Sequence, residues 1–555
     1  MIDHRRPVGP RTLAARAKAA VTLSAMLRSA VSSGEVRRVV CLVPDPHARF
    51  TAVELGAEFF VDTVLSSGYG LCSYVFGWST TRDPVNAPAV DQFLGGYGDL
   101  LMRPDLATLA PLEPGTWQVV CDVEWPDARG VPEAPRSALR DRLVDAEQLG
   151  LVPSVGIEHE VTFTGVDGTP LVAGGLDYSV AALTPLRALL ADVNGAVDGL
   201  GLGVESARGE VHPGQYEIVL RHRDALAACD DAMLVQSAVR RAAALRGVRA
   251  GYLAAESSGT GSSCHVHLSL SDPDGSPLTP GAAPGEPSTL FGHFIAGVLR
   301  AATDLTAIWA PTWNSYVRLR TAPFSPRGLR WGRDDRTAAV RLAGSGRSLR
   351  MEARFAGADA QPHLVVAALI GAGVAGVRER LPLPDEGRVV GELARTPWEA
   401  LTLLDSKLAR AALGDAVIDH QVAMLGDELT AGLDAVTDWQ RSRGICVAEV
   451  TTTFFGTSTL HVTDGRSDVL VDGFLTRPPL LRVLLGRIAP DVERITAHLA
   501  RGRVERLDAL FVAHSHYDHV MDAPDVVKLL GGTLHGSEST LNVGRGAASP
   551  RTRCP

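Results

Sequence analysis

Three short segments that alternate carboxylates or histidines with other residues constrain the fold of this chain more than any other feature. Residues 156–160 read Gly-Ile-Glu-His-Glu, residues 265–267 read His-Val-His, and residues 210–217 hold two glutamates on either side of a Pro-Gly turn. Side chains two residues apart on a β-strand point to the same face of its sheet. The segments therefore predict a sheet that gathers carboxylates and imidazoles on one face.

Such a face can serve as a metal site. Clustered oxygen ligands suit hard divalent cations such as magnesium, and the phosphates of a bound nucleotide can complete the coordination. Taken alone, any one of these segments is more often the solvent-facing side of a sheet. Glu352 adds a further carboxylate downstream, and the occurrence of all of them in one chain favours the metal site over that alternative.

Length and composition limit the classes of protein to which the chain can belong. A chain of 555 residues is too long for one hydrophobic core, so we expect about two to four domains. The net charge of −9 argues against general nucleic-acid binding. No apolar run approaches the roughly 20 residues that span a bilayer. The seven cysteines are scattered without a Cys-x-x-Cys pair, which indicates reduced thiols in a cytoplasmic protein.

The amino-terminal segment carries Arg5-Arg6 before a mildly apolar stretch, as a twin-arginine export signal does. Such a signal needs an uninterrupted apolar segment. Four basic residues interrupt this one: Arg11, Arg16, Lys18 and Arg28. An alanine-rich amphipathic helix is therefore the favoured interpretation, and we expect neither export nor a membrane anchor.

Changes in residue pattern divide the chain into three expected domains. Strands are expected at 39–43 and 117–123, helices at 138–149 and 224–245, and a helix-rich region at 397–439. After residue 445 the pattern changes to strands rich in valine and threonine, and from residue 544 it resembles neither a strand nor a helix. We therefore expect domains at 1–112, 113–444 and 445–555.

Five motifs follow one another in a fixed order from residue 156 to residue 355. They read Gly-x-Glu-x-Glu, Glu-Val-x-Pro-Gly-Gln-x-Glu, Gly-x-x-x-His-x-His-x-Ser-Leu, Asn-Ser-Tyr-x-Arg and Arg-x-Glu-x-Arg-Phe. Together with Pro-Asp-Leu-x-Thr-Leu at 104–109, they resemble the glutamine synthetase family over about residues 35–440. The resemblance implies an α+β fold with a small β-grasp N-terminal domain and a large α/β catalytic domain. It also implies a ring-shaped homo-oligomer whose active sites lie between subunits.

The resemblance assigns roles to particular residues. The family's first metal site falls on Glu160, Glu210 and Glu217, and its second falls on Glu158, His265 and Glu352. The implied cofactor is Mg²⁺ or Mn²⁺, with ATP as co-substrate. The nucleotide contacts fall on Glu205, His267, Ser269 and Arg347, the glutamate contacts on Gly261, Arg318 and Arg354, and the arginines facing the transferred phosphoryl group on Arg336 and Arg341.

The implied reaction agrees with the chemistry of these residues. A carboxylate resists attack by an amine until one of its oxygens becomes part of a leaving group, which phosphorylation by ATP achieves. Phosphoryl transfer depends mainly on positioning and charge neutralisation, which metals and arginines provide. Arginine also binds carboxylates through two parallel hydrogen bonds, which suits Arg318 and Arg354. We therefore expect an ATP-dependent ligase whose partners are a small-molecule acid and an amine.

The sequence departs from the family pattern on the amine side. Phe324 stands where the family has an acidic residue that takes a proton from ammonium, Thr260 replaces a glutamate-binding asparagine, and Asp335 replaces the asparagine before Arg336. A phenyl ring can cover the apolar part of a larger amine or offer a cation–π face. We therefore expect an organic amine to be preferred over ammonia. Two alternatives stay open: Phe324 only packs beneath its loop, or the chain is an impaired scaffold that binds nucleotide and metal.

The carboxy-terminal segment carries a separate motif. An apolar strand expected at 507–512 leads into His-Ser-His-Tyr-Asp-His at 514–519, and a helix is expected at 523–530. The motif resembles the metallo-β-lactamase superfamily, which implies a partial αββα sandwich and a metal-dependent hydrolase. There, His514 and His516 would bind one zinc or iron ion, and Asp518 and His519 a second. The alternative is a histidine-rich surface turn. The family's later ligands do not occur before Pro555, so we expect the segment to be inactive alone.

Overall fold

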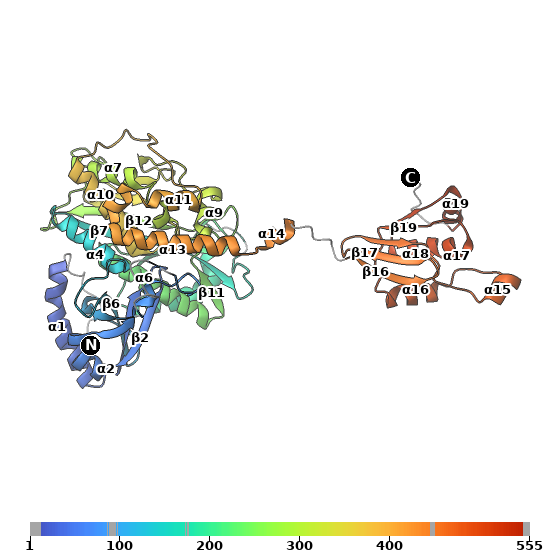
Figure 1. Cartoon of the computed structure of the whole chain (residues 1–555), viewed down its shortest axis with the longest axis horizontal. Coiled ribbons are helices and arrows are strands. Elements are labelled where there is room, and N and C mark those ends of the chain that lie inside the picture. Colours follow the sequence, from blue (N-terminus) through green and yellow to red (C-terminus); the bar gives the residue numbers. More distant parts are fainter. Residues whose placement is uncertain are drawn as a thin grey trace. The chain divides into compact units, whose positions relative to one another are not determined.

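The computed structural model describes residues 13–443 and 450–547, apart from 86, 88–95, 97, 173, 175 and 176. The chain divides into two compact units, Met1–Asp434 and Ala435–Pro555 (Figure 1). The division falls ahead of the boundary expected at residue 444, which lies outside the described residues. Each unit has its own sheet structure and its own hydrophobic core.

The amino-terminal part of the first unit is a six-stranded sheet in the order β2-β1-β6-β4-β3, with β5 pairing with β6. β1 and β6 run parallel, and the other neighbours run antiparallel. Helix α1 (Leu13–Ser32) contributes Leu27 to the core of this part (Figure 1, blue). The strands are β1 (Arg38–Pro44), β2 (Phe50–Gly56), β3 (Tyr69–Cys72), β4 (Asp99–Pro104), β5 (Ala110–Glu113) and β6 (Thr116–Glu124). Short helical segments are α2 (Ala57–Phe59), η1 (Phe60–Val64), α3 (Leu65–Ser67), η2 (Ser73–Phe76) and η4 (Leu106–Thr108).

The boundary expected at residue 112 would cut β6 from this sheet. The strand expected at 117–123 is β6, and it lies in the middle of the sheet between β1 and β4. Most of its residues are buried whichever face they point to, which is typical of a central strand covered on both sides. The amino-terminal sheet therefore extends to Glu124, and the continuous apolar run was the signal for a central position.

The rest of the first unit is built on a nine-stranded sheet, which we call the large sheet, in the order β13-β14-β15-β12-β7-β9-β8. The long central strand β7 also pairs with β10 at its start and with β11 at its end. β13 and β14 run parallel, while β7 runs antiparallel to both β12 and β9. The strands are β7 (Val152–Gly165), β8 (Val204–Gly209), β9 (Gln215–Leu220), β10 (Arg223–Asp224), β11 (Val248–Gly251), β12 (Cys264–Ser271), β13 (Trp331–Arg333), β14 (Val340–Ala343) and β15 (Arg350–Ala353).

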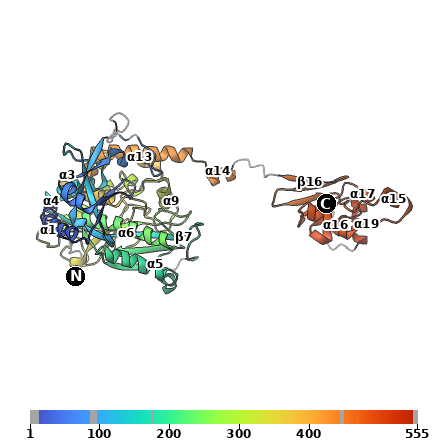
Figure 2. The ribbon, with the colours of Figure 1, turned by 90° about the horizontal axis from the view of Figure 1, so that it is seen from below.

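Helices cover this sheet, and α10 (Pro362–Glu379) lies at their centre, packed against α4 and α7. α10 is long and apolar enough to cross a membrane, but 78% of that stretch is buried inside the unit, so it is a core helix. The helices expected at 138–149 and 224–245 are α4 and α6, and Figure 2 shows α5 beside α6. The helices are α4 (Pro135–Glu147), α5 (Val180–Gly199), α6 (Ala225–Leu245), α7 (Thr289–Ala301), α8 (Thr306–Trp309), α9 (Trp313–Thr321), η5 (Gly346–Ser348), α10, α11 (Pro397–Leu404), α12 (Lys407–Leu413) and α13 (Asp415–Asp434). The next helix, α14 (Asp438–Arg443), belongs to the second unit.

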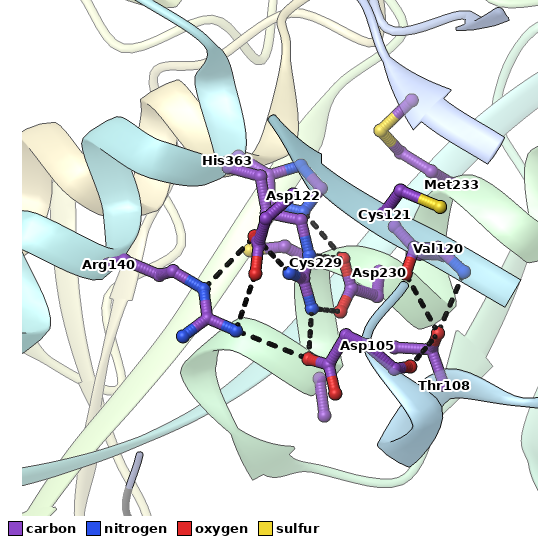
Figure 3. Close-up of polar contacts among 12 residues, drawn as sticks. Asp105, Thr108, Val120, Cys121, Asp122, Arg140, Cys229, Asp230, Met233 and His363 are labelled. Carbon is purple, nitrogen blue, oxygen red and sulfur yellow. Dashed lines mark hydrogen bonds and ion pairs between the residues drawn. The ribbon is translucent and has the colours of Figure 1, made fainter. Parts of the chain in front are cut away.

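A buried network of charges joins the amino-terminal sheet to the helices that cover the large sheet (Figure 3). Arg136 on α4 forms ion pairs with Asp105 at 2.6 Å, with Asp230 on α6 at 3.0 Å, and with Asp122 on β6. His363 at the start of α10 lies 3.0 Å from the same Asp230 carboxylate. Buried charges are tolerated only when they are paired in this way. The network therefore fixes the position of the amino-terminal sheet against the helices that cover the large sheet.

The second unit contains a five-stranded sheet in the order β16-β17-β18-β19-β20. β16 to β18 are antiparallel, whereas β18, β19 and β20 are parallel. The strand expected at 507–512 is β19, and the helix expected at 523–530 is α18. No helix was expected from residue 544, yet α19 runs to Gly546, and 548–555 lie outside the described residues. The elements are β16 (Thr451–Gly456), β17 (Thr459–Thr463), β18 (Asp468–Val471), α15 (Leu480–Leu485), α16 (Val492–Arg501), β19 (Ala509–Phe511), α17 (Tyr517–Val520), α18 (Ala523–Leu530), β20 (Thr533–His535) and α19 (Glu538–Gly546).

Candidate active site

Strand register brings together the residues expected at the second metal site. His265 on β12 lies directly opposite Glu158 on β7, and Glu352 comes from the next strand, β15. His265 Nδ1 lies 3.7 Å from a carboxylate oxygen of Glu158 and 3.7 Å from one of Glu352. His267, expected at the nucleotide, also reaches the cluster, with Nε2 2.8 Å from Glu158 Oε1. The potential ligand atoms of Glu158, His267 and Glu352 lie within 4.8 Å of one another.

The residues expected at the first metal site lie beside this cluster. Glu217 on β9 is opposite Glu160 on β7, and its ligand atom groups with those of Glu158 and His265. Glu160 accepts hydrogen bonds of 2.7 Å from Ser263 N, Ser263 Oγ and Gln215 Nε2. Each carboxylate therefore lies on the same face of the sheet, as the alternating pattern predicted.

Arg208, which the sequence analysis missed, occupies part of this first group. Its Nε lies 2.8 Å from Glu210 and its Nη2 lies 2.9 Å from Glu217. Arg208 is two residues before Glu210 and opposite Glu217 in the β8–β9 register. The same two-residue spacing that revealed the carboxylates was therefore the available signal for this arginine. Its positive charge lies beside two glutamates that a metal cation would otherwise contact.

Crowding of the carboxylates shifts their proton affinities. Burial, together with the nearby Glu158 carboxylate, raises the pKa of Glu217 to about 9. Burial also raises the pKa of Glu210. For Glu158, burial alone would raise the pKa, but His265 and His267 outweigh it and hold the pKa well below its usual range. A buried set of oxygen ligands with one imidazole fits Mg²⁺ or Mn²⁺, because a divalent cation offsets such repulsion.

A pocket of about 390 Å³ adjoins the cluster and holds all the residues expected to contact the nucleotide. Arg350, which was not predicted from the sequence, also lines this pocket, and its Nε donates to His267 Nδ1 at 3.1 Å. That hydrogen bond fixes the imidazole so that its other nitrogen faces Glu158. Glu158 and His267 therefore belong both to the metal cluster and to the pocket wall. The expected residues in the wall are Glu205, His267, Ser269 and Arg347.

The residues expected at the acid substrate adjoin the cluster outside the nucleotide pocket, and Gln215 Nε2 donates both to Glu160 and to the Gly261 carbonyl oxygen. A Cβ on Gly261 would lie 2.7 Å from Ala322 Cβ and 3.2 Å from Arg318 Cγ, so no larger residue fits there. The Arg318 guanidinium is buried and donates to the carbonyl oxygens of Phe355 at 2.9 Å and Arg354 at 3.2 Å. Arg354 in turn forms an ion pair with Glu352.

The two arginines expected at the phosphoryl group differ in position. Arg341 on β14 donates to Glu352 at 2.8 Å and also pairs with Asp334. Arg336 is exposed on the loop between β13 and β14. Asp335 holds that loop, because its carboxylate accepts hydrogen bonds from Arg330 at 2.6 Å and from Thr337 N at 2.8 Å. The change from asparagine at this position therefore has a structural role.

Phe324 and Thr260 lie in loops beside the acid side. Phe324 follows α9 with 64% of its surface exposed, so it does not pack beneath its loop. Thr260 closes a turn with Ser257, donating to its carbonyl oxygen at 2.8 Å and accepting from its amide at 2.9 Å. The aromatic ring is therefore free to contact a substrate, and the threonine is occupied by its own turn.

Three histidines of the second unit lie close together in the segment that follows β19. The ring centroids of His514 and His516 are 4.6 Å apart, and those of His514 and His519 are 3.9 Å apart. Asp518 reaches His519 Nε2 at 3.9 Å. Asp472, which the sequence analysis missed, lies 2.6 Å from His519 Nδ1. It stands directly after β18 in the left-handed region, with φ of 53°, and the Asp-Gly pair was the signal for it.

The first unit is similar to known proteins in both sequence and fold. Residues 132–443 match the family model described as the glutamine synthetase catalytic domain. Gamma-glutamylethanolamide synthetase GlnA4 of Streptomyces coelicolor is 37% identical over 439 residues, covering 75% of this chain and 94% of that protein. Glutamate–isopropylamine ligase of a Pseudomonas species is 30% identical over 416 residues, covering 70% and 91%. GmaS without ligand has a TM-score of 0.66 at 24% identity, covering 75% of this chain and 99% of that one, which is a likeness of fold.

Proposed function

The chain belongs to the glutamine synthetase family, and from that membership we propose that it couples the side-chain carboxylate of glutamate, or of a glutamate-like acid, to an organic amine with ATP. The observation that carries this proposal is the carboxylate and imidazole cluster that shares Glu158 and His267 with the wall of the adjoining pocket. That arrangement suits the transfer of a phosphoryl group from a nucleotide in the pocket to an acid beyond the cluster.

The chain's own residues would divide the work as follows. Glu158, His265 and Glu352 would hold one Mg²⁺ or Mn²⁺, and Glu160, Glu210 and Glu217 a second. Bound metal would supply positive charge to the phosphates. Arg208 would have to release Glu210 and Glu217 before those carboxylates could bind a cation. Glu205, His267, Ser269 and Arg347 would hold ATP, and Arg336 and Arg341 would face its terminal phosphate.

The acid side would then complete the reaction. Gly261, Arg318 and Arg354 would position the substrate so that a carboxylate oxygen attacks the γ-phosphorus and ADP leaves. The amine nitrogen would attack the resulting acyl carbon, phosphate would depart with one former carboxylate oxygen, and the proton lost from the nitrogen would pass to that phosphate or to water. The chain's residues contribute position and positive charge throughout.

An organic amine is the proposed nucleophile. Phe324 is exposed beside the acid side and carries no charge to attract ammonium or accept its proton. A cation–π contact with the ring would favour a larger amine by about 0.5–2 kcal/mol. The two relatives at 37% and 30% identity are named for the ethanolamide and isopropylamine that they make or use.

The test is ADP release with glutamate and a panel of amines: ethanolamine, isopropylamine and ammonium, each with and without Mg²⁺. We expect turnover only with metal, and faster with an organic amine. Glu158→Ala and Glu352→Ala should abolish it while leaving the fold intact, whereas Glu392→Ala, an exposed glutamate paired with Arg395, should not change it. Ammonium as the best substrate of the wild type would contradict the proposed nucleophile.

A second candidate, a scaffold without turnover, is favoured by one observation. Arg208, Arg341 and Arg354 occupy carboxylates that a metal would need. Calorimetry separates the two candidates. A scaffold would bind ATP or metal without releasing ADP for any acid and amine, and a ligase would release ADP in proportion to amide.

We further propose that the amino-terminal sheet is a β-grasp domain and that the chain assembles into a ring-shaped homo-oligomer with active sites between subunits. The support is the family membership. Multi-angle light scattering and negative-stain microscopy of the active protein would test it, and a fully active monomer would contradict it.

For the second unit we propose a partial metallo-β-lactamase-type sandwich that binds zinc or iron through His514, His516, Asp518 and His519. The support is the gathering of three imidazoles and Asp472 after two parallel strands. Metal analysis of the full chain and of His514→Ala, with Glu538→Ala as a control, tests it. We expect weak, substoichiometric metal that the histidine change removes. Tight stoichiometric zinc with hydrolase activity would show a complete site instead.

A further inference from the structure

A second pocket lies behind the large sheet, on the face opposite the carboxylate cluster. His159 alternates with Glu158 and Glu160 on β7 and so points to that face, where its ring centroid lies 5.0 Å from that of Tyr252. Tyr252 follows β11 and lines the pocket together with Arg240 on α6. We call this pocket the rear pocket, and its other polar lining residues are His47, Arg49, Thr80, Gln236, Thr312 and Asp359.

Arg240 brings a positive charge to this pocket that no described residue neutralises. Its guanidinium carbon lies 4.8 Å from the centroid of the Tyr252 ring, and the side chain forms no hydrogen bond or ion pair within the described part of the chain. Burial lowers the pKa of Arg240, and the nearby charge of Arg49 acts in the same direction. A guanidinium nevertheless stays charged at neutral pH. Charges withdrawn from water are normally paired in proteins, so the missing partner of Arg240 is an anion.

The other basic groups of the lining already have partners. Arg49 pairs with Asp45 at 2.9 Å. Its two terminal nitrogens donate to the carbonyl oxygens of Thr80 at 2.8 Å and Ser79 at 3.3 Å. His47 Nε2 lies 2.6 Å from a backbone carbonyl oxygen. The free positive charge of the rear pocket is therefore that of Arg240.

The carboxylate in the lining does not serve as the partner of Arg240. Asp359 Oδ2 accepts hydrogen bonds from Thr312 Oγ1 at 2.7 Å and from Ser315 Oγ at 2.6 Å. Its Oδ1 is fully buried, away from the space that a ligand could occupy. Both oxygens are thus withdrawn from the pocket, and an anion beside Arg240 would not meet an exposed carboxylate oxygen of Asp359.

Tyr252 supplies a second donor. Its hydroxyl has no hydrogen-bond partner among the described residues, yet it does not belong to their fully buried polar atoms that lack one. The same is true of the guanidinium nitrogens of Arg240, so both groups keep solvent-accessible surface. Burial raises the pKa of Tyr252, which keeps the hydroxyl protonated and able to donate.

We propose that the rear pocket binds a small oxyanion, a phosphate or carboxylate group, between the guanidinium of Arg240 and the hydroxyl of Tyr252. Arginine offers parallel N–H groups that match two oxygens of either anion, and the hydroxyl can donate to one of them. A neutral or cationic occupant would leave Arg240 uncompensated. The site is separate from the proposed ligase reaction, because the rear pocket shares no residue with the metal cluster or the nucleotide pocket.

The experiment is calorimetric titration of the full chain with inorganic phosphate and, separately, with acetate. We expect saturable binding of at least one anion, weakened at least tenfold by Arg240→Met. Arg241→Met is the matched control, since this neighbouring arginine is exposed and paired with Glu113, and it should bind as the wild type does. Tighter binding of phosphate would identify a phosphate site, and tighter binding of acetate a carboxylate site.

Two further variants keep the test decisive. Tyr252→Phe removes only the hydroxyl and should weaken the same anion by about two- to tenfold, so it carries the test if Arg240→Met fails to fold. Arg347→Met removes a basic group of the nucleotide pocket, which could also attract phosphate. The binding assigned to the rear pocket should persist in Arg347→Met.

Three results would overturn the proposal. The first is no saturable binding of either anion up to about 10 mM. The second is equal binding by Arg240→Met and wild type. The third is binding that Arg347→Met removes and Arg240→Met retains, which would place the anion in the nucleotide pocket. None of these results depends on ligase turnover, so they are distinguishable from a failure of the proposed function.

Discussion

Replacing Arg136 with methionine should destabilise the first unit strongly, because its guanidinium is the shared partner of three carboxylates. Arg136 is only 2% exposed and Asp230 is fully buried. Methionine keeps the apolar length of the side chain, so the change tests the charge more than the packing. The other two carboxylates keep arginine partners, since Asp105 also pairs with Arg16 and Arg140, and Asp122 with Arg140.

The magnitude follows from what remains around Asp230. Its remaining partners are His363 at 3.0 Å and Arg16 at 3.7 Å. Removing one member of a buried ion pair costs roughly 3–5 kcal/mol, because the other charge stays buried. Since Asp105 and Asp122 are compensated elsewhere, we expect one such loss and not three. The exposed pair of Arg129 and Asp127 is the control, and Arg129→Met should cost about 1 kcal/mol or less.

Urea unfolding followed by tryptophan fluorescence measures this loss. All tryptophans except Trp439 lie in the first unit, so the signal reports on that unit. The transition of the second unit, followed by circular dichroism, should not move. A loss below about 1 kcal/mol, or an equal loss in Arg129→Met, would refute the role assigned to the network.

The pH dependence gives a second check. Although burial alone would raise the pKa of Asp230, Arg136 and His363 hold it well below its usual range. A depressed pKa contributes stability that is present above the unfolded value of about 3.9 and is lost as pH falls through the folded value. Without Arg136 the buried carboxylate takes up a proton at higher pH. The difference between wild type and variant should therefore shrink from pH 7 toward about pH 4.

Three further predictions concern the candidate active site. Gly261→Ala should raise KM for glutamate at least tenfold, because the added Cβ would collide with Ala322. The control is Gly195→Ala, whose added Cβ meets nothing within 4 Å and should leave KM unchanged. Equal KM values for the two variants would contradict the close approach at Gly261. The pKa of about 9 for Glu217 means that this carboxyl is protonated at pH 7. Mg²⁺ must displace that proton, so its affinity should rise by up to about tenfold for each pH unit toward pH 9. The released proton should appear in calorimetry as a binding heat that depends on the buffer. A flat affinity would show that Glu217 is not a ligand. Phe324→Glu should raise the ratio of kcat/KM for ammonium to that for the best organic amine by about tenfold or more, and an unchanged ratio would remove Phe324 from amine selection.

The sequence alone predicted the strands of the sheet that carry Glu158, Glu160 and His265. Alternation at 156–160 and 265–267 placed Glu158, Glu160 and His265 on one face, because the two-residue period of a strand is fixed by backbone geometry. Motif order supplied the positions of Glu205 and Arg347, which local pattern could not, since their pocket is formed by separate strands and a loop.

Other features were not predicted, because they depend on contacts between residues that are far apart in the sequence. The placement of β6 was missed because a boundary drawn from local composition does not reveal which sheet a strand joins. Arg208, Arg350 and Asp472 act through partners that are distant in the sequence or set by register, and an isolated arginine or aspartate resembles any surface charge. The buried partners of Arg136 were invisible for the same reason, since they come from β6, α6 and the segment after β4.

The central claim is that ATP activates a glutamate carboxylate as an acyl phosphate before an amine attacks. Glutamate labelled with ¹⁸O in its side-chain carboxylate, incubated with ATP, Mg²⁺ and ethanolamine, provides the measurement. Mass spectrometry should find one ¹⁸O atom in the released phosphate for each γ-glutamyl amide formed, and none with Glu352→Ala. Phosphate free of ¹⁸O alongside amide formation, or ATP cleavage without any amide, would contradict the claim.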